Sequence, residues 1–89
     1  MLKKRVLERL VRSFSNHRRI QILDLLDKNP ELSVSEIAYM LKINIKTASE
    51  HIRRLTIAGL IMKKSQGKAI RHKLTHRGIN ILIFLRTLE

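Results

Sequence analysis

The 89-residue sequence predicts a mostly α-helical chain with one small β-hairpin, in the order α-α-α-α-β-β-α. Three observations predict this order. Apolar residues recur at three- and four-residue spacing over residues 2–58, which is the period of a helix. The spacing then changes to two, the period of a strand, on both sides of residues 65–68. From residue 75 onward the helical spacing returns.

Capping and turn residues mark the ends of the predicted helices. Pro30 stops the second helix, because proline cannot continue the backbone hydrogen bonding of a helix, and Gly59 ends the fourth. The residues that can cap the N-termini are Ser15 or Asn16 for the second helix, Ser33 with Glu36 for the third, Asn44 for the fourth and Thr75 for the last.

The segment "LIMKKSQGKAIRHKLT" predicts two strands around a tight turn, in which Gly67 can adopt a positive φ. A short helix, a turn, a second helix and then such a hairpin form a winged helix-turn-helix. The sequence therefore predicts a single winged helix-turn-helix domain over residues 1–89. The two faces of the second strand carry Ile70, His72 and Leu74 on one side and Arg71, Lys73 and Thr75 on the other.

The charge of the chain favours a polyanionic partner. It has 19 Lys and Arg against 7 Asp and Glu, a net charge of +12, which suits nucleic acid or an acidic membrane surface. No apolar run reaches the roughly 18 residues that cross a bilayer, and the N-terminus does not read as a secretory signal. Without cysteine there is no disulfide and no thiolate metal site. We therefore expect a cytoplasmic protein with no membrane partner.

The segment "NIKTASEHIRRL" predicts a helix that fits the major groove of DNA. Ala48, Ile52 and Leu55 share one face, which we expect to pack on the domain. The other faces carry side chains that can reach base edges and phosphates. The predicted DNA-binding residues of this recognition helix, over about residues 44–58, are Asn44, Ile45, Lys46, Thr47, Ser49, Glu50, Arg53 and Arg54.

Glu50 is unexpected on the polar face of so basic a chain. Its carboxylate can accept a hydrogen bond from cytosine N4. This would lower the non-specific affinity for DNA but raise the selectivity for sequence. It can also form an intrahelical ion pair with Lys46 or Arg54, each four residues away. The ion pair is the commoner arrangement, and both interpretations stay open on the sequence alone.

The hairpin is basic on and beside its turn. A basic hairpin directly after a recognition helix can lie along the phosphate backbone or enter the minor groove. The predicted DNA-binding residues of this wing, over about residues 63–73, are Lys63, Lys64, Gln66, Gly67, Lys68 and Arg71, with Lys73 beside them.

Most of the chain, residues 13–82, resembles the ArsR/MarR-like winged-helix transcriptional regulators, above all the small ArsR-type proteins. The resemblance implies a homodimer, most often a repressor, whose fourth helix reads operator DNA. The cysteines of metal-sensing relatives are Ser33 and Ser35 here, and the usual turn glycine is Lys42, whose left-handed conformation would cost on the order of 1 kcal/mol. The segments that carry the resemblance are "FSNHRRIQILDLL", "ELSVSEIAYML", "INIKTASEHIRRLTIAGLI", "GKAIRHKLT" and "LTHRGINIL".

The histidines and carboxylates predict neither a metal site nor an active site. We expect His51 and His72 to face the protein, and no histidine pair has the spacing of a zinc site with a further ligand nearby. No phosphate-binding loop, carboxylate pair or nucleophile elbow occurs. The sequence therefore predicts no enzyme activity, no metal, no cofactor and no evident small-molecule effector.

The first and last helices, over residues 1–14 and 76–89, are too apolar to have only one buried face. In the last helix Ile79, Leu82 and Ile83 form one side, and the other side would be an exposed patch, which favours a two-fold dimer. The alternative is that both apolar stripes are buried within one monomer. The predicted interface residues are Leu7, Val11 and Phe14 from the first helix and Ile81, Phe84, Leu85 and Leu88 from the last.

These observations favour a sequence-specific regulator that binds double-stranded DNA. The alternative is an architectural protein that binds duplex DNA through charge with little sequence specificity. A winged helix used for RNA or protein contacts is a third reading, although the low aromatic content argues against base stacking on single strands.

Overall fold

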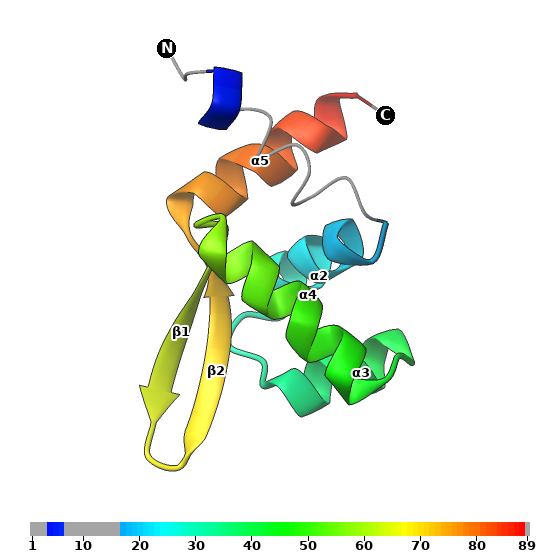
Figure 1. Ribbon diagram of the computed structural model, residues 1–89, viewed down its shortest axis with the longest axis vertical. Coiled ribbons are helices and arrows are strands. Elements are labelled where there is room, and N and C mark those ends of the chain that lie inside the picture. Colours follow the sequence, from blue (N-terminus) through cyan, green and yellow to red (C-terminus); the bar gives the residue numbers. More distant parts are fainter. Residues whose placement is uncertain (1–3, 7–16, 89) are drawn as a thin grey trace.

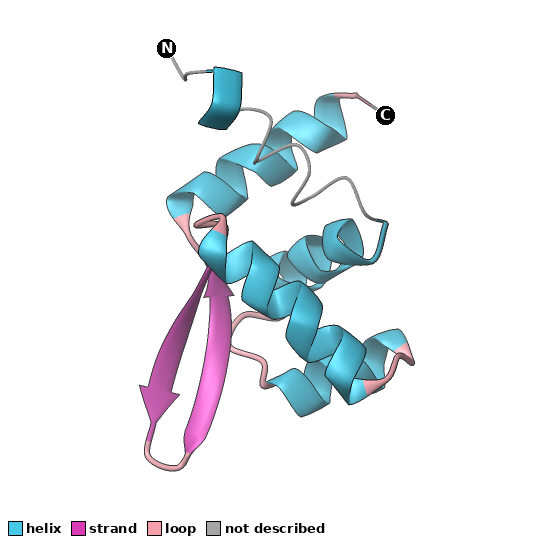
Figure 2. Cartoon of the chain, in the orientation of Figure 1, coloured by secondary structure: helices cyan, strands magenta, loops and turns pink. Residues whose placement is uncertain are grey.

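The computed structural model describes residues 4–6 and 17–88 (Figure 1). Most of the described chain is helical and carries one two-stranded hairpin, so the predicted fold class is confirmed (Figure 2). Residues 4–6 are helical, while Leu7, Val11, Phe14 and the capping pair Ser15 and Asn16 lie outside the described residues. The elements are α2 (His17–Lys28), α3 (Val34–Leu41), α4 (Ile45–Ile57), β1 (Ile61–Gln66), β2 (Ala69–Leu74) and α5 (His76–Thr87).

The core lies where α2, α3 and α4 meet the base of the hairpin and α5. It is built from aliphatic side chains, and burying each of them contributes roughly 1.5–3 kcal/mol to folding. The hairpin tip extends away from the helices, at the end of the molecule opposite α5 (Figure 1). The largest buried apolar residues are Ile22, Leu23 and Leu26 of α2, Ile37 of α3, Ile52 and Leu55 of α4, Leu60, Ile61 and Leu74 of the hairpin region, and Leu82 of α5.

Both ends of α3 are fixed by local hydrogen bonds. The Ser33 hydroxyl oxygen accepts from the Glu36 backbone N–H (3.2 Å), and the Glu36 carboxylate accepts from the Ser33 N–H (3.0 Å), so the predicted capping box is confirmed. At the C-terminal end Lys42 has φ 56° and ψ 46°, the left-handed conformation expected where relatives carry glycine. The Ile43 N–H then donates to the Ala38 carbonyl (3.0 Å), which ends α3 and turns the chain toward α4.

The hairpin turns through only two residues. Gln66 pairs with Ala69 at the last position of the ladder, which leaves Gly67 and Lys68 as the turn. Gly67 adopts φ 59°, as predicted, because tight two-residue turns require a positive φ at this position. The turn is therefore shorter than the four residues, 65–68, that the sequence suggested.

The base of the hairpin is attached to the loop between α2 and α3. Leu32 forms an isolated antiparallel bridge with His72, whose N–H donates to the Leu32 carbonyl at 2.9 Å. The His72 side chain is 1 % exposed, and its Nδ1 lies 3.0 Å from the same carbonyl oxygen, so the prediction that His72 faces the protein is confirmed. Ile70 shares its side of the strand but is 52 % exposed, because it lies nearer the tip, beyond the core.

A tight junction joins the end of α4 to the start of α5. Thr75 caps α5 as predicted, since its Oγ1 accepts from the Gly78 N–H (3.0 Å); the same hydroxyl donates to the Gly59 carbonyl (2.6 Å). The Thr75 N–H donates to the Leu60 carbonyl (3.1 Å). Gly78 lies so close to Leu60 that a Cβ at this position would overlap the Leu60 carbonyl oxygen.

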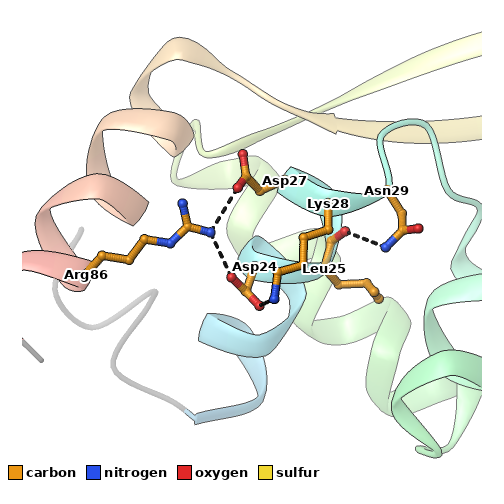
Figure 3. A network of polar contacts seen from close by, with 6 residues as sticks. All are labelled: Asp24, Leu25, Asp27, Lys28, Asn29 and Arg86. Atoms are coloured by element: carbon orange, nitrogen blue, oxygen red, sulfur yellow. Dashed lines mark hydrogen bonds and ion pairs between the residues drawn. The ribbon is translucent and has the colours of Figure 1, made fainter.

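A network of ion pairs joins α5 to α2 (Figure 3). Arg86 Nη2 donates to one carboxylate oxygen each of Asp24 and Asp27, both at 2.9 Å, and Lys28 Nζ donates to Asp24 at 2.9 Å. Hydrogen bonds, first from Arg86 and then from Lys28, hold the pKa of Asp24 below its usual value. These pairs are exposed and individually weak.

Candidate nucleic-acid interface

α4 presents a polar face to solvent opposite the face that packs on the domain. Ala48, Ile52 and Leu55 are 2 % exposed or less, which confirms the predicted packing face. At about 100° per residue, Glu50 lies almost directly opposite them. The helix lies at the front of the molecule in Figure 1, with the hairpin to one side. All the predicted recognition residues are exposed: Asn44, Ile45, Lys46, Thr47, Ser49, Glu50, Arg53 and Arg54.

The N-terminus of α4 is well defined. The Asn44 side-chain oxygen accepts from the Lys46 backbone N–H at 2.7 Å, so the predicted cap is confirmed. This cap places Lys46 in the first turn, where the helix dipole also attracts anions. Lys46 therefore adds a mobile positive charge to a site that already favours phosphate.

The carboxylate of Glu50 holds two arginines. Its Oε1 accepts from Arg53 Nη2 (2.7 Å) and from Arg54 Nε (2.9 Å), and its Oε2 accepts from Arg53 Nε (3.1 Å). These bonds, those from Arg53 first, lower the pKa of Glu50 to about 2. The predicted intrahelical pair with Arg54 is confirmed. The pair with Arg53, three residues away, was missed because only four-residue spacing was considered.

A hollow of about 550 Å³ lies between α3 and the N-terminal end of α4. Tyr39, which is 85 % exposed, and Lys42 line it together with Ile45. Neither Tyr39 nor Lys42 was among the residues predicted to contact DNA. The signal was present, because Tyr39 lies on the side of α3 opposite its buried residues Ile37 and Ala38.

The wing contains lysines that make no contact with a protein acceptor. Lys63, Lys68 and Lys73 are exposed, and none of their side-chain amino groups has a hydrogen bond or ion pair within residues 17–88. Lys68 lies in the turn beside Gly67, at the tip of the hairpin. Gln66 contributes the last pair of the backbone ladder.

Two other predicted wing residues attach the hairpin to the body of the protein. Lys64 Nζ contacts the Glu31 carboxylate at 2.9 Å. Arg71 Nη1 donates to the Glu31 carbonyl (2.9 Å) and to the Glu36 carboxylate (3.2 Å). Glu31 has a φ of 67°, so a residue with a strained backbone makes the contact with Lys64 and one of the two contacts with Arg71. Lys64 and Arg71 therefore orient the wing, a role that the sequence did not reveal.

Most of the described lysines that lack a carboxylate partner lie on one part of the surface. Each carboxylate side chain in the described residues contacts an arginine or lysine. Apart from Lys4 near the N-terminus, the described lysines that lack a carboxylate partner are Lys42, Lys46, Lys63, Lys68 and Lys73. All of them lie on the helix-turn-helix turn, the start of α4 or the hairpin.

The predicted division of α5 into two faces was wrong. Ile81 and Leu85, assigned to the outer face, pack against the core beside Leu82. The exposed apolar residues of α5 are instead Ile79, Ile83, Phe84 and Leu88. The buried stripe of α5 begins at Gly78 and continues at three- and four-residue spacing. It was not recognised because glycine, which has no side chain, does not mark an apolar position in the sequence pattern. Phe84 and Leu88 keep the exposed positions that were predicted for them.

The side chain of His51, like that of His72, has a partner within the protein. His51 Nδ1 lies 3.3 Å from Arg19 Nε, and burial, followed by the charge of Arg19, lowers the pKa of His51. This contact agrees with the expected packing of His51 against the protein. In the part of the chain that the structure describes, no three histidine or carboxylate side chains lie close enough together to hold a metal ion. No helix there is long and apolar enough to cross a membrane.

The fold and the sequence match known regulators. One similar structure is the homodimeric winged helix-turn-helix DNA-binding domain of Mb0332 from Mycobacterium bovis, a possible ArsR-family transcriptional regulator. It is 29% identical, and the alignment covers 93% of this chain and 76% of that chain with a TM-score of 0.80. HlyU from Vibrio cholerae N16961 is 27% identical, and the alignment covers 98% of this chain and 97% of that chain with a TM-score of 0.81. The transcriptional repressor BigR from Xylella fastidiosa, 23% identical, shares the fold, with a TM-score of 0.79 over 92% of this chain and 81% of that chain. No curated protein matches by sequence.

The family model described as bacterial regulatory protein, arsR family, matches residues 16–63. This stretch contains α2, α3, α4 and the beginning of β1, so it includes the whole helix-turn-helix and its exposed recognition face. The match spans more than half of the chain, and the order of elements agrees with that of the similar structures. The chain therefore belongs to the arsR family of bacterial regulatory proteins and is a winged-helix DNA-binding transcriptional regulator, not an enzyme.

Proposed function

We propose that the protein is a homodimeric repressor that recognises a specific sequence in duplex DNA as a single winged-helix domain over residues 1–89. In this proposal α4 enters the major groove and the hairpin contacts the backbone or the minor groove. The observation that carries it is the distribution of lysines described above: those without carboxylate partners surround the exposed face of α4 and the hairpin. Such a regulator acts in the cytoplasm, where the DNA lies.

The dimensions of α4 support its entry into the major groove. Its 13 residues span about 20 Å at 1.5 Å per residue, and the groove is about 12 Å wide. Exposed polar side chains extend from Lys46 in the first turn to Arg53 and Arg54 in the third. Ile45, half-exposed near the N-terminus, can contact a thymine methyl group. These side chains supply both base contacts and phosphate contacts.

The flanking elements supply contacts to the backbone. In helix-turn-helix proteins the first helix of the pair crosses the phosphate backbone, and here that helix is α3. Tyr39 and Lys42 are exposed at its C-terminal end, beside the start of α4. On the other side of α4, Lys63, Lys68 and Lys73 of the hairpin can reach phosphates while Lys64 and Arg71 keep the hairpin oriented.

Exposed apolar residues of α5 support a two-fold dimer. Ile79, Ile83, Phe84 and Leu88 lie on the side of α5 that the core does not cover. Exposed apolar patches of this kind usually mark an interface. The similar domain from Mycobacterium bovis is described as homodimeric. A two-fold dimer would place the two recognition helices about one DNA turn (~34 Å) apart and would require an inverted repeat.

Selection of bound sequences from a random duplex pool at about 150 mM salt tests the proposal, because purely ionic binding is weak at this salt concentration. We expect an enriched inverted repeat with half-sites roughly 10 base pairs apart, centre to centre. Light scattering should give a dimer mass at micromolar concentration, and transcription from a promoter that contains the repeat should fall when the protein is added. A pool without enrichment, with affinity that collapses as salt rises, would instead support an architectural protein.

A further inference from the structure

We infer that Glu50 is a positioning residue that holds Arg53 ready to read guanine, so that each DNA half-site contains a guanine contacted by Arg53. This inference rests on the proposed function, because it requires the outward face of α4 to lie in the major groove. It adds the chemistry of the recognised base, which the proposed function leaves open.

The ion pair between Glu50 and Arg53 fixes the plane of the guanidinium group. Two parallel hydrogen bonds join the groups, Nε to Oε2 at 3.1 Å and Nη2 to Oε1 at 2.7 Å. Bidentate pairs of this kind set both the position and the orientation of an arginine. An arginine that is ordered before DNA arrives loses less rotamer freedom on binding than one that is mobile in solvent.

The N–H donors of Arg53 that are not bonded to Glu50 match the hydrogen-bond acceptors of guanine. Arginine has five N–H donors, and the bonds to Glu50 use Nε and one hydrogen of Nη2. The terminal edge, formed by Nη1 and the second hydrogen of Nη2, has no acceptor within the described residues. This edge carries two parallel donors, which match the adjacent O6 and N7 acceptors of guanine. Guanine is the only base that presents two adjacent acceptors in the major groove.

The same geometry disfavours direct reading of cytosine by Glu50. Oε1 already accepts from two arginines and Oε2 from one. A hydrogen bond from cytosine N4 would compete with these charge-assisted bonds, which are stronger than neutral ones. The single negative charge of Glu50 between Arg53 and Arg54 also weakens their non-specific attraction to phosphate, so it favours contacts that depend on sequence.

The test compares Glu50→Gln with Asp27→Asn. Each change removes one negative charge, but Asp27 lies on α2 and contacts Arg86, away from the DNA-facing side of α4. Binding is measured to the duplex selected by the wild type and to the same duplex with 7-deazaguanine, which lacks N7, in place of the selected guanine. We expect the wild type and Asp27→Asn to bind the 7-deazaguanine duplex roughly tenfold more weakly than the selected duplex. Glu50→Gln should bind it less than about threefold more weakly. Arg53→Ala, which removes the guanidinium group, should also lose the discrimination against 7-deazaguanine.

The outcomes separate this inference from the proposed function. A wild-type pool without an enriched sequence would overturn both. An enriched site without guanine would overturn only the inference, and so would a Glu50→Gln protein that discriminates as well as Asp27→Asn. Loss of a cytosine preference in Glu50→Gln would also overturn it and would show that the carboxylate reads the base itself. If Glu50→Gln fails to fold, Arg53→Ala decides whether Arg53 contacts the guanine, and an Arg53→Ala protein that discriminates as well as the wild type would overturn the inference.

Discussion

Replacement of Gly78 by alanine should destabilise the protein although alanine is the better helix former. The added Cβ would overlap the Leu60 carbonyl oxygen and lie 3.1 Å from the Leu60 carbonyl carbon, so α5 must move away by about 1 Å. This movement strains the bond that the Leu60 carbonyl accepts from the Thr75 N–H and loosens the packing of Leu82 on the core.

The expected size of the effect follows from three contributions. Overpacking a close contact typically costs 1–3 kcal/mol, and weakening one backbone hydrogen bond costs about 1 kcal/mol. The higher helix propensity of alanine returns about 1 kcal/mol. The net loss in the free energy of unfolding is about 2 kcal/mol, or roughly 8–16 °C in melting temperature for a domain of this size.

Thermal and urea unfolding followed by circular dichroism measures this loss. Wild type and variants must be compared at one protein concentration, because the stability of the proposed dimer would depend on concentration. Ser49→Ala is the control: Ser49 is exposed in the middle of α4, away from the apolar residues of α5, and this change should raise stability by a few tenths of a kcal/mol. A Gly78→Ala protein within 0.5 kcal/mol of wild type, about half of one lost hydrogen bond, would refute the close approach of α5 to Leu60.

Three further outcomes can be measured. Lys42→Gly should raise the free energy of unfolding by up to about 1 kcal/mol in urea melts, because glycine adopts the left-handed conformation of this turn without strain; a loss of stability would contradict that geometry. Because burial and Arg19 lower the pKa of His51, the unfolded chain takes up a proton there more readily than the folded protein. Stability should therefore begin to fall as the pH drops through the unfolded-state pKa of about 6.5 and keep falling until the pH passes the lower folded-state pKa, and His51→Gln should flatten that part of the curve in melts at stepped pH. Lys68→Ala should reduce the slope of log affinity against log salt by about 1.8, because each protomer of the proposed dimer loses one phosphate contact worth about 0.9. Lys64→Ala, which removes a residue already paired with a carboxylate, should change the slope less; equal slopes for the two variants would contradict the division of the wing lysines.

Local interactions let the sequence predict much of the fold. The capping box of Ser33 and Glu36, the Asn44 cap and the positive φ of Gly67 each depend on residues within a few positions of one another. Their geometry follows from residue type and spacing, without knowledge of the rest of the chain. The period of apolar residues likewise located the packing face of α4 correctly. The order of elements, and with it the exposed polar face of α4, could therefore be predicted.

Tertiary packing alone decided the roles of the charged side chains and the orientation of α5. Lys64 is 33 positions from Glu31, and Arg71 is 35 positions from Glu36, so no local pattern distinguishes these wing residues from Lys63 or Lys68. On α5, the close approach of Gly78 to Leu60 selects the stripe that enters the core. A sequence specifies which residues share a helix face by its period. Which of two apolar faces is buried, and which charge finds a partner, depends on contacts between segments distant in the chain.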